Sequence, residues 1–166
     1  TSFDPYSTSP VDKLRAPGSV HWFGTDELGR DLYTRVVYGA SLSVQAALLA
    51  VGIALAGGLS LGVLAGFAGG RLDAALMRLV DVLLALPGLL LALAIVTAIG
   101  FGTVPVAIAV GVGIIPGFAR TTRAEVLRVK TLPYVEAARL GGASWRRTLM
   151  GHVLPNAWGP VAVLAT

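Results

Sequence analysis

Residues 136–156 read EAARLGGASWRRTLMGHVLPN, and this stretch separates the main parts of the chain. It is polar and basic, whereas long apolar segments precede it and another apolar run begins at Ala157. Charged connections between apolar segments are typical of membrane proteins, in which each apolar segment crosses the bilayer as a helix. The stretch therefore predicts a loop on one face of a membrane, within an all-α, polytopic transmembrane helical bundle.

The composition also indicates a chain that is embedded in lipid. Hydrophobic residues make up 55% of the sequence and charged residues 13%, whereas about a quarter of a soluble domain is charged. The chain has no Cys, which excludes disulfides and thiolate metal sites. Its two histidines, His21 and His152, lie far apart in the sequence without further ligands. We therefore expect no metal and no cofactor.

Positive charge is concentrated around the quoted loop. Residues 120–147 contain seven bases and two acids, although the net charge of the whole chain is only +4. Such a cluster has two interpretations, a nucleic-acid patch or a cytoplasmic loop that follows the positive-inside rule. No nucleic-acid motif accompanies the cluster. We therefore interpret it as a cytoplasmic loop and expect a lipid bilayer, but no nucleic acid, as its surroundings.

Three apolar segments are long enough to be considered as complete spans. We place them at about residues 42–67, 76–99 and 106–119, with a cytoplasmic loop at 120–155 and the start of another span at 157–166. Residues 1–41 are polar and are expected to form an irregular extracytoplasmic segment. Within the second span, Pro87 predicts a kink, and Arg78 and Asp81 are spaced to pair on one face.

Small residues recur every four positions along the first span. This spacing places them on one helical face, where the backbone of another helix can approach closely. The stripe therefore predicts a packing surface, formed by Ala54, Gly58, Gly62, Gly66 and Gly70.

Within the loop, the turn and cap residues predict two short helices. The first begins near Pro133 with Thr131 as a possible cap, and it ends at Gly141 and Gly142. Ser144 caps the second, and Pro155 closes it. Its apolar stripe (Trp145, Leu149 and Val153) has two interpretations: it rests on its own protein or bilayer, or it enters a groove of a partner.

The extracytoplasmic segment contains a second polar motif, GTDELGRD, at residues 24–31. Thr25 or Asp26 is placed to cap a short helix there. Elsewhere, Gly111 and Gly113 lack the spacing of a nucleotide loop, and Lys130 with Thr131 lacks the glycines of a Walker loop. The sequence therefore predicts no ATP site of its own.

Several of these motifs together resemble a known family. The pattern Glu136, Ala137, Ala138, then Gly142, then Leu154-Pro155 resembles the EAA loop of permease subunits of ABC importers. Residues 21–39, HWFGTDELGRDLYTRVVYG, and 78–87, RLVDVLLALP, resemble the C-type permeases of dipeptide, oligopeptide and nickel importers. The resemblance extends from about residue 18 to residue 166, and it implies further spans before Thr1 and after Thr166.

The resemblance implies an ABC importer type I permease fold in a bacterial cytoplasmic (inner) membrane. It implies a subunit that is not an enzyme, with ATP hydrolysis in a separate chain. The expected partners are a second permease subunit, so that a heterodimer forms, two ATP-binding subunits and an extracytoplasmic substrate-binding protein. The cargo would be a di- or oligopeptide or a related small ligand such as a nickel complex.

The resemblance also implies which residues meet the ATP-binding subunit. The loop would form a coupling helix shaped by Glu136, Ala137, Ala138 and Gly142, with contacts near Ala143, Ser144, Trp145 and Arg146.

The predicted topology places residues 24–31 outside, where Asp26, Arg30 and Asp31 are expected to form either a gate or receptor contact, or a local salt-bridge network. Two alternatives to an ABC permease stay open from the residues alone, a secondary transporter and an intramembrane enzyme subunit.

Overall fold

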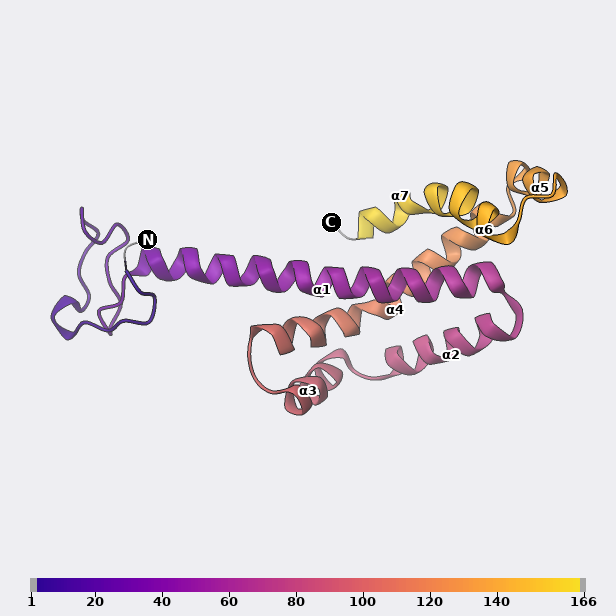
Figure 1. Ribbon diagram of the computed structural model, residues 1–166. Helices are drawn as coiled ribbons and strands as arrows, with labels where there is room; N and C mark the ends of the chain where they lie inside the picture. Colours follow the sequence, from indigo (N-terminus) through magenta and orange to yellow (C-terminus); the bar gives the residue numbers. More distant parts are fainter. Residues whose placement is uncertain (1–2, 165–166) are drawn as a thin grey trace. The chain divides into compact units, whose positions relative to one another are not determined.

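The computed structural model describes residues 3–164, and these residues divide into two compact units (Figure 1). The first unit ends at Ala47 and the second begins at Leu48, so the division falls inside helix α1 (Leu32–Ala68). The ends of two predicted segments, at residues 1–2 and 165–166, lie outside the described residues. The described part is helical, and its β structure is limited to one isolated bridge between Thr25 and Asp31.

In the second unit, helix α1 packs along α4 (Thr103–Lys130) through its predicted stripe of small residues. A Cβ atom on Gly58 would lie 2.2 Å from Phe118 Cβ, and one on Gly62 would lie 2.5 Å from Thr122 Cβ. Gly66 makes the same approach to Val126, one turn further along both helices. In these three contacts the residue numbers increase in the same direction along both helices, so α1 and α4 run parallel.

The stripe is therefore confirmed as a packing surface over most of its length. Ala54, Gly58, Gly62 and Gly66 are buried, and Ala54 belongs to a core cluster with Phe118 and Val161. The prediction is wrong for Gly70, because nothing lies within 4 Å of a Cβ built there.

Between these parallel helices the chain returns through α2 (Gly70–Ala85) and α3 (Gly88–Ile99). The span predicted at 76–99, with a kink at Pro87, is divided between these two helices, which meet at an angle of 93°. Leu86 is extended (φ −83°, ψ 130°) because the ring of Pro87 disfavours a helical residue before it. The predicted kink is therefore a complete break.

The described residues accordingly contain two helices that are long and apolar enough to cross a membrane, α1 and α4. A third span exists only if the bent pair α2 and α3 is counted as one. Helix α4 continues through Pro116 and well beyond the predicted span of 106–119.

Two ion pairs connect α2 to α4. Arg123 donates from two nitrogens to Asp73, at 2.6 and 2.7 Å, and Arg120 donates to Asp81 at 2.6 Å. The predicted pairing of Arg78 with Asp81 is therefore wrong, because a neighbouring helix supplies the partner. The Asp73–Arg123 pair also places the start of α2 beside the C-terminal part of α4, so the connection between α1 and α2 lies at the same end of the unit as the basic loop.

In the first unit, a short 3₁₀ turn (Pro10–Asp12) precedes a tightly folded loop, and no helix begins at Thr25 or Asp26 as predicted. Helix α1 begins at Leu32 instead. Asp31 caps it, since its carboxylate accepts a hydrogen bond from the backbone N–H of Thr34 at 2.7 Å. The helix thus starts ten residues before the predicted first span.

The chain ends in a run of short helices: α5 (Pro133–Leu140), α6 (Trp145–Thr148), a π-helical turn (Leu149–Val153) and α7 (Leu154–Leu164). Pro155 does not close the helix as predicted. The N–H of Leu154 reaches back five residues to Leu149, and this wider turn relieves the clash between a proline ring and the carbonyl four residues earlier. The proposed cap Thr131 donates instead to the carbonyl of Arg128, and Leu132 occupies the cap position.

The glycine contact between α1 and α4 can be tested by a matched pair of substitutions. Gly62→Ala should lower the free energy of unfolding by about 1–3 kcal/mol, because the added methyl group overlaps Thr122 and the carbonyl of Ala119. Gly52→Ala on the exposed side of the same helix, where a Cβ meets nothing within 4 Å, should be neutral or slightly stabilising. Unfolding in detergent micelles measures both. Equal effects would contradict the close approach.

The Asp73–Arg123 pair gives a second prediction. Asp73→Asn should destabilise the protein by about 1–3 kcal/mol, because Arg123 is only 33% exposed and loses its charged partner. The control is Glu125→Gln, which breaks the pair with Arg128, whose side chain is 56% exposed, and should cost less than about 0.5 kcal/mol. The same unfolding measurement compares the two, and a larger effect for Glu125→Gln would refute the assignment.

Candidate functional site

The turn between α5 and α6 is held by hydrogen bonds between backbone groups. The N–H of Gly142 donates to the carbonyl of Arg139, and the N–H of Ala143 donates to the carbonyl of Ala138, both at 3.0 Å. This is the Schellman motif, which requires a left-handed residue after the helix. Gly142 supplies it, with φ +84°. Gly142 and Ala138 thus have defined structural roles, and the prediction that glycine ends this helix is confirmed.

The second loop helix starts as predicted. The Ser144 hydroxyl accepts a hydrogen bond from the N–H of Arg147 at 3.4 Å. Leu149 and Val153 are buried, but Trp145 is 54% exposed, and its ring makes an edge contact with Phe67 with 5.0 Å between the ring centroids. The apolar stripe therefore rests on its own protein at two of its three positions.

A hydrophobic cluster beneath the loop joins it to the long helices. Val135 of α5, together with Leu149 and Val153, packs with Phe67 at the end of α1 and with the last turns of α4. The full cluster of buried residues is Phe67, Val126, Val129, Val135, Leu149, Val153 and Ala157. Lys130 adds a polar link, since its ammonium donates to the carbonyl of Phe67 at 2.8 Å and so caps α1. The loop is therefore attached to α1 and α4 at one end of the unit.

The outer side of the loop remains uncovered. Six of the eight predicted contact residues are exposed, and Ala138 and Ala143 are half-buried. Leu140 accompanies them and is 90% exposed. Met150 is 66% exposed, but it lies beside Leu59, Val63 and Leu64 of α1. Sequence reasoning missed Leu140, although it directly precedes the glycines.

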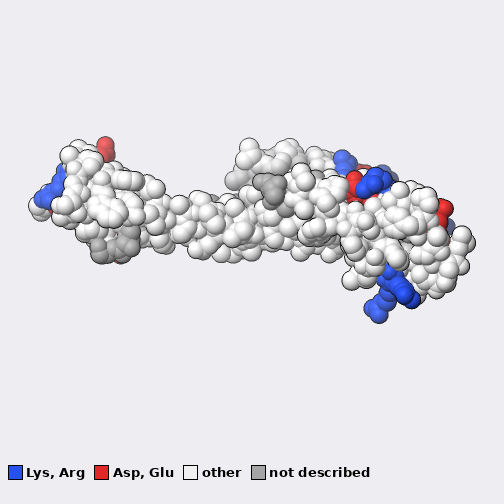
Figure 2. Space-filling view, turned by 90° about the horizontal axis from the view of Figure 1, so that it is seen from above, with Lys and Arg blue, Asp and Glu red and all other residues white. Residues whose placement is uncertain are grey.

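Unbalanced positive charge lies on the same surface. Four of the basic side chains bind acidic side chains or a backbone carbonyl of this chain: Arg120, Arg123, Arg128 and Lys130. By contrast, Arg139, Arg146 and Arg147 have no acidic partner among residues 3–164. Figure 2 shows that the charged side chains of the second unit gather at one end, while the rest of its visible surface is uncharged. The loop thus offers apolar and cationic groups together.

The predicted polar residues of the first unit form two separate arrangements. Asp26 accepts hydrogen bonds from the backbone N–H groups of Leu28 and Arg30 and from the Arg30 guanidinium, the last at 2.7 Å. The backbone N–H of Arg30 has the largest effect on the pKa of Asp26. Together with the Arg30 guanidinium and the N–H of Leu28, it lowers that pKa to about 2 against the opposing effect of burial. The geometry agrees with the local salt-bridge network.

Asp31 belongs to the other arrangement, with His21 and Thr34. Its carboxylate lies 2.9 Å from His21 Nδ1, and both side chains are nearly buried. Burial alone would raise the pKa of Asp31, but hydrogen bonds from Thr34 and His21 outweigh it and the pKa is lowered. Sequence reasoning missed His21 as the partner because ten residues of irregular chain separate the two. The only available signal was an Asp directly before the first apolar helical residues.

The pKa of Asp26 predicts how acid affects the first unit. A folded-state pKa below the ordinary value means that the ionised carboxylate stabilises the fold at neutral pH. This stabilisation should persist down to about pH 4 and be lost as the pH falls toward about 2. Asp26→Asn should remove it at all pH values, whereas Glu27→Gln at the exposed neighbouring position should not. Hydrogen exchange of residues 24–31 measures this, and identical exchange in the two variants would contradict the network.

Comparisons with known proteins agree with this architecture. A family model described as "Binding-protein-dependent transport system inner membrane component" matches residues 58–166. The chain is 40% identical over its full length to a dipeptide transport system permease protein of Alkalihalophilus pseudofirmus, of which it covers 55%. It is 43% identical over 99% of its length to a di/tripeptide transport system permease protein of Pseudomonas aeruginosa, and covers 54% of it.

A glutathione transport system permease protein of Shigella dysenteriae is 45% identical over 99% of the chain, which covers 54% of that protein. The chain thus spans about half the length of the curated relatives it matches. The family match extends from the small-residue stripe of α1 through the loop and α7, and the chain belongs to the family of binding-protein-dependent transport system inner membrane components.

Proposed function

We propose that this chain is part of a multi-pass permease subunit of an ATP-driven importer in a bacterial cytoplasmic membrane. The observation that carries the proposal is the loop at residues 133–153. Its inner face is fixed to α1 and α4 by a buried cluster, while its outer face exposes Leu140 and three arginines without acidic partners among the described residues. Such a surface suits a partner protein whose groove accepts a short helix.

The proposed partner on this surface is a separate ATP-binding subunit. Glu136, Ala137, Ala138 and Gly142 shape the coupling helix, and Ala143, Ser144, Trp145 and Arg146 lie near the contact. The buried cluster and the Lys130 cap offer a direct connection from the loop to the ends of α1 and α4. Closure of two ATP-binding subunits would act through this connection and favour one of two orientations of the spans.

A second permease subunit is the proposed neighbour within the membrane. The Asp81–Arg120 pair supports it, because both side chains are more than half exposed and each lies next to apolar turns of its helix, Val82 to Ala85 in α2 and Phe118 and Ala119 in α4. Ion pairs in membrane helices normally face protein or a water-filled path. This face therefore suits the interface with the second subunit or the pathway between the two.

Peptides are the proposed cargo, since the relatives above are described as permeases for dipeptides, tripeptides or glutathione. A binding protein would deliver them on the side of residues 1–41. Asp31 is nearly buried beside His21. For Asp26 and Arg30 the geometry favours a structural role, because their paired side chains are mostly turned inward. They would hold the shape of a gate or receptor-facing surface through their neighbours.

The coupling proposal is tested at Gly142 in the complete transporter. Gly142→Val should weaken association with the ATP-binding subunit or uncouple ATP hydrolysis from uptake about tenfold, because a β-branched residue does not tolerate φ +84°. Gly142→Asn is the matched control, since Asn adopts this conformation readily and nothing lies within 4 Å of its Cβ. Copurification of the subunits, ATP hydrolysis and peptide uptake are measured together.

Wild-type coupling in Gly142→Val would argue against the loop as the site of energy transfer. Equal loss in both variants would argue against the conformational explanation. Peptide uptake that persists without ATP hydrolysis would reject the importer itself in favour of a secondary transporter.

A further inference from the structure

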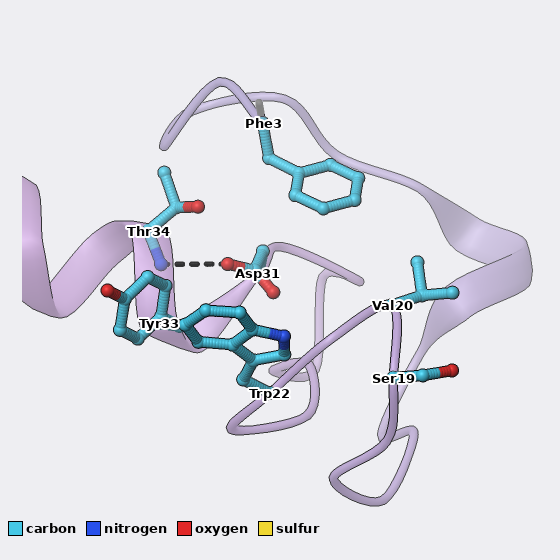
Figure 3. A pocket seen from close by; sticks show the side chains of 7 residues that line it. All are labelled: Phe3, Ser19, Val20, Trp22, Asp31, Tyr33 and Thr34. Carbon is cyan, nitrogen blue, oxygen red and sulfur yellow. Dashed lines mark hydrogen bonds between the residues drawn. The ribbon is translucent and has the colours of Figure 1, made fainter. Parts of the chain in front are cut away.

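The first unit contains a cavity of about 220 Å³ beside the start of α1. Aromatic side chains form much of its wall, with Phe3 and Trp22 on opposite sides of Asp31 in the view of Figure 3 and Tyr33 next to Trp22. The rings of Trp22 and Tyr33 lie 4.9 Å apart. Ser19 and Val20 line the remaining side.

Asp31 is the only charged residue that lines this cavity among the described residues. One carboxylate oxygen lies beside His21 and the other accepts the N–H of Thr34, and each keeps a further lone pair. A second cavity, of about 310 Å³, shares Asp31 and Phe3 with the first and is also lined by Asp4 and Asp12. His21 also lines the second cavity and pairs with Asp31, and Asp12 pairs with Arg15. No described lysine or arginine lines either cavity, so the carboxylates outnumber the basic groups there and favour a cation.

Thr34 provides an independent indication of a ligand. Thr34 is 2% exposed and lines the cavity; its hydroxyl makes no hydrogen bond of good geometry, although it is close enough to the Asp31 carboxylate to lower the pKa of that group. A buried hydroxyl without a partner costs about 1–3 kcal/mol, which a bound donor would offset. In Figure 3 this hydroxyl points into the space above Asp31.

A primary ammonium group fits these three features together. It carries three donors and no acceptor, so it can bond the Asp31 carboxylate and the Thr34 hydroxyl at once. Its remaining charge is stabilised by the faces of aromatic rings. The volume is smaller than the roughly 300–1,000 Å³ of sites that enclose a whole drug-sized ligand, so the cavity suits an end group.

We propose that this cavity binds the primary ammonium and first apolar side chain of a small peptide, between Asp31, Thr34 and the rings of Trp22 and Tyr33. The choice of a peptide rests on the proposed function. The ammonium chemistry itself rests on the cavity alone, and a free amine of similar size would share it.

The test measures binding to the complete transporter in lipid nanodiscs, without receptor and without nucleotide, by ligand-observed NMR titration. The probes are leucyl-alanine, N-acetyl-leucyl-alanine and isopentylamine. Leucyl-alanine should bind with a Kd of roughly 0.1–10 mM, as one end group gives modest affinity. Acetylation removes the charge and should abolish binding. Isopentylamine distinguishes a general amine site from a peptide site. If it binds as tightly as leucyl-alanine, the cavity accepts any amine of this size; if it binds more weakly, the cavity is specific for a peptide.

Thr34→Val is the deciding variant, because it keeps the shape and removes only the unpartnered hydroxyl. It should lower the affinity for leucyl-alanine about tenfold while leaving stability equal or higher. Thr122→Val is the matched control, since Thr122 has the other buried hydroxyl without a partner and lies in the second unit; it should leave affinity unchanged. Trp22→Leu, at a side chain that is 62% exposed, should weaken binding at least threefold.

Unchanged affinity in Thr34→Val, or equal binding of the acetylated peptide, would overturn the site. Binding that Thr34→Val and Thr122→Val weaken equally would place the ligand elsewhere. None of these readings depends on ATP or on uptake, so failure of the importer proposal and failure of this site are distinguishable.

Discussion

The close contact between α1 and α4 is the constraint on which the second unit depends. Gly58, Gly62 and Gly66 leave no room for a Cβ against Phe118, Thr122 and Val126. Three contacts with a constant separation of 60 residues between the facing positions fix both the register and the parallel direction. Because two parallel helices cannot be joined by a short loop, the chain must return between them through α2 and α3. The ends of α1 and α4 are thereby placed side by side, and the loop is built on both.

This arrangement gives the loop one buried and one exposed face. On the buried face, the side chains of Val135, Leu149 and Val153 pack in the cluster with Phe67. Leu140 and the three arginines are left exposed around the Schellman turn at Gly142, which connects the two parts of the chain that reach the cluster. The loop is thus held to the long helices by buried packing on one face and exposes apolar and cationic side chains on the other. Such a surface is suited to bind another protein and to transmit its movement to the helices.

Several features of this arrangement could be predicted from local sequence. Gly142 predicts the end of a helix, Ser144 predicts a helix cap, and the four-residue repeat in α1 predicts a packing surface. Each of these depends on the residue's own backbone or helical face. The failures concern choices between competing partners. Asp81 pairs with Arg120 across helices rather than with Arg78, Asp31 takes His21 from an irregular loop, and Pro155 is accommodated by a wider turn. Sequence spacing shows that a partner is possible, but only the fold shows which one is nearer.

The π-helical turn at Leu149–Val153 has a geometric consequence for the last helix. Leu149, Val153, Ala157 and Val161 are four residues apart and are all buried. In a regular α-helix, positions with this spacing drift around the axis by about 40° at each step, so a long stripe gradually leaves its partner. The wider turn rotates less per residue and reverses the drift over the first step. One extra residue in the turn thus acts as a phase correction, which keeps Val161 aligned with Ala54 and Phe118 while Leu149 stays beneath the loop.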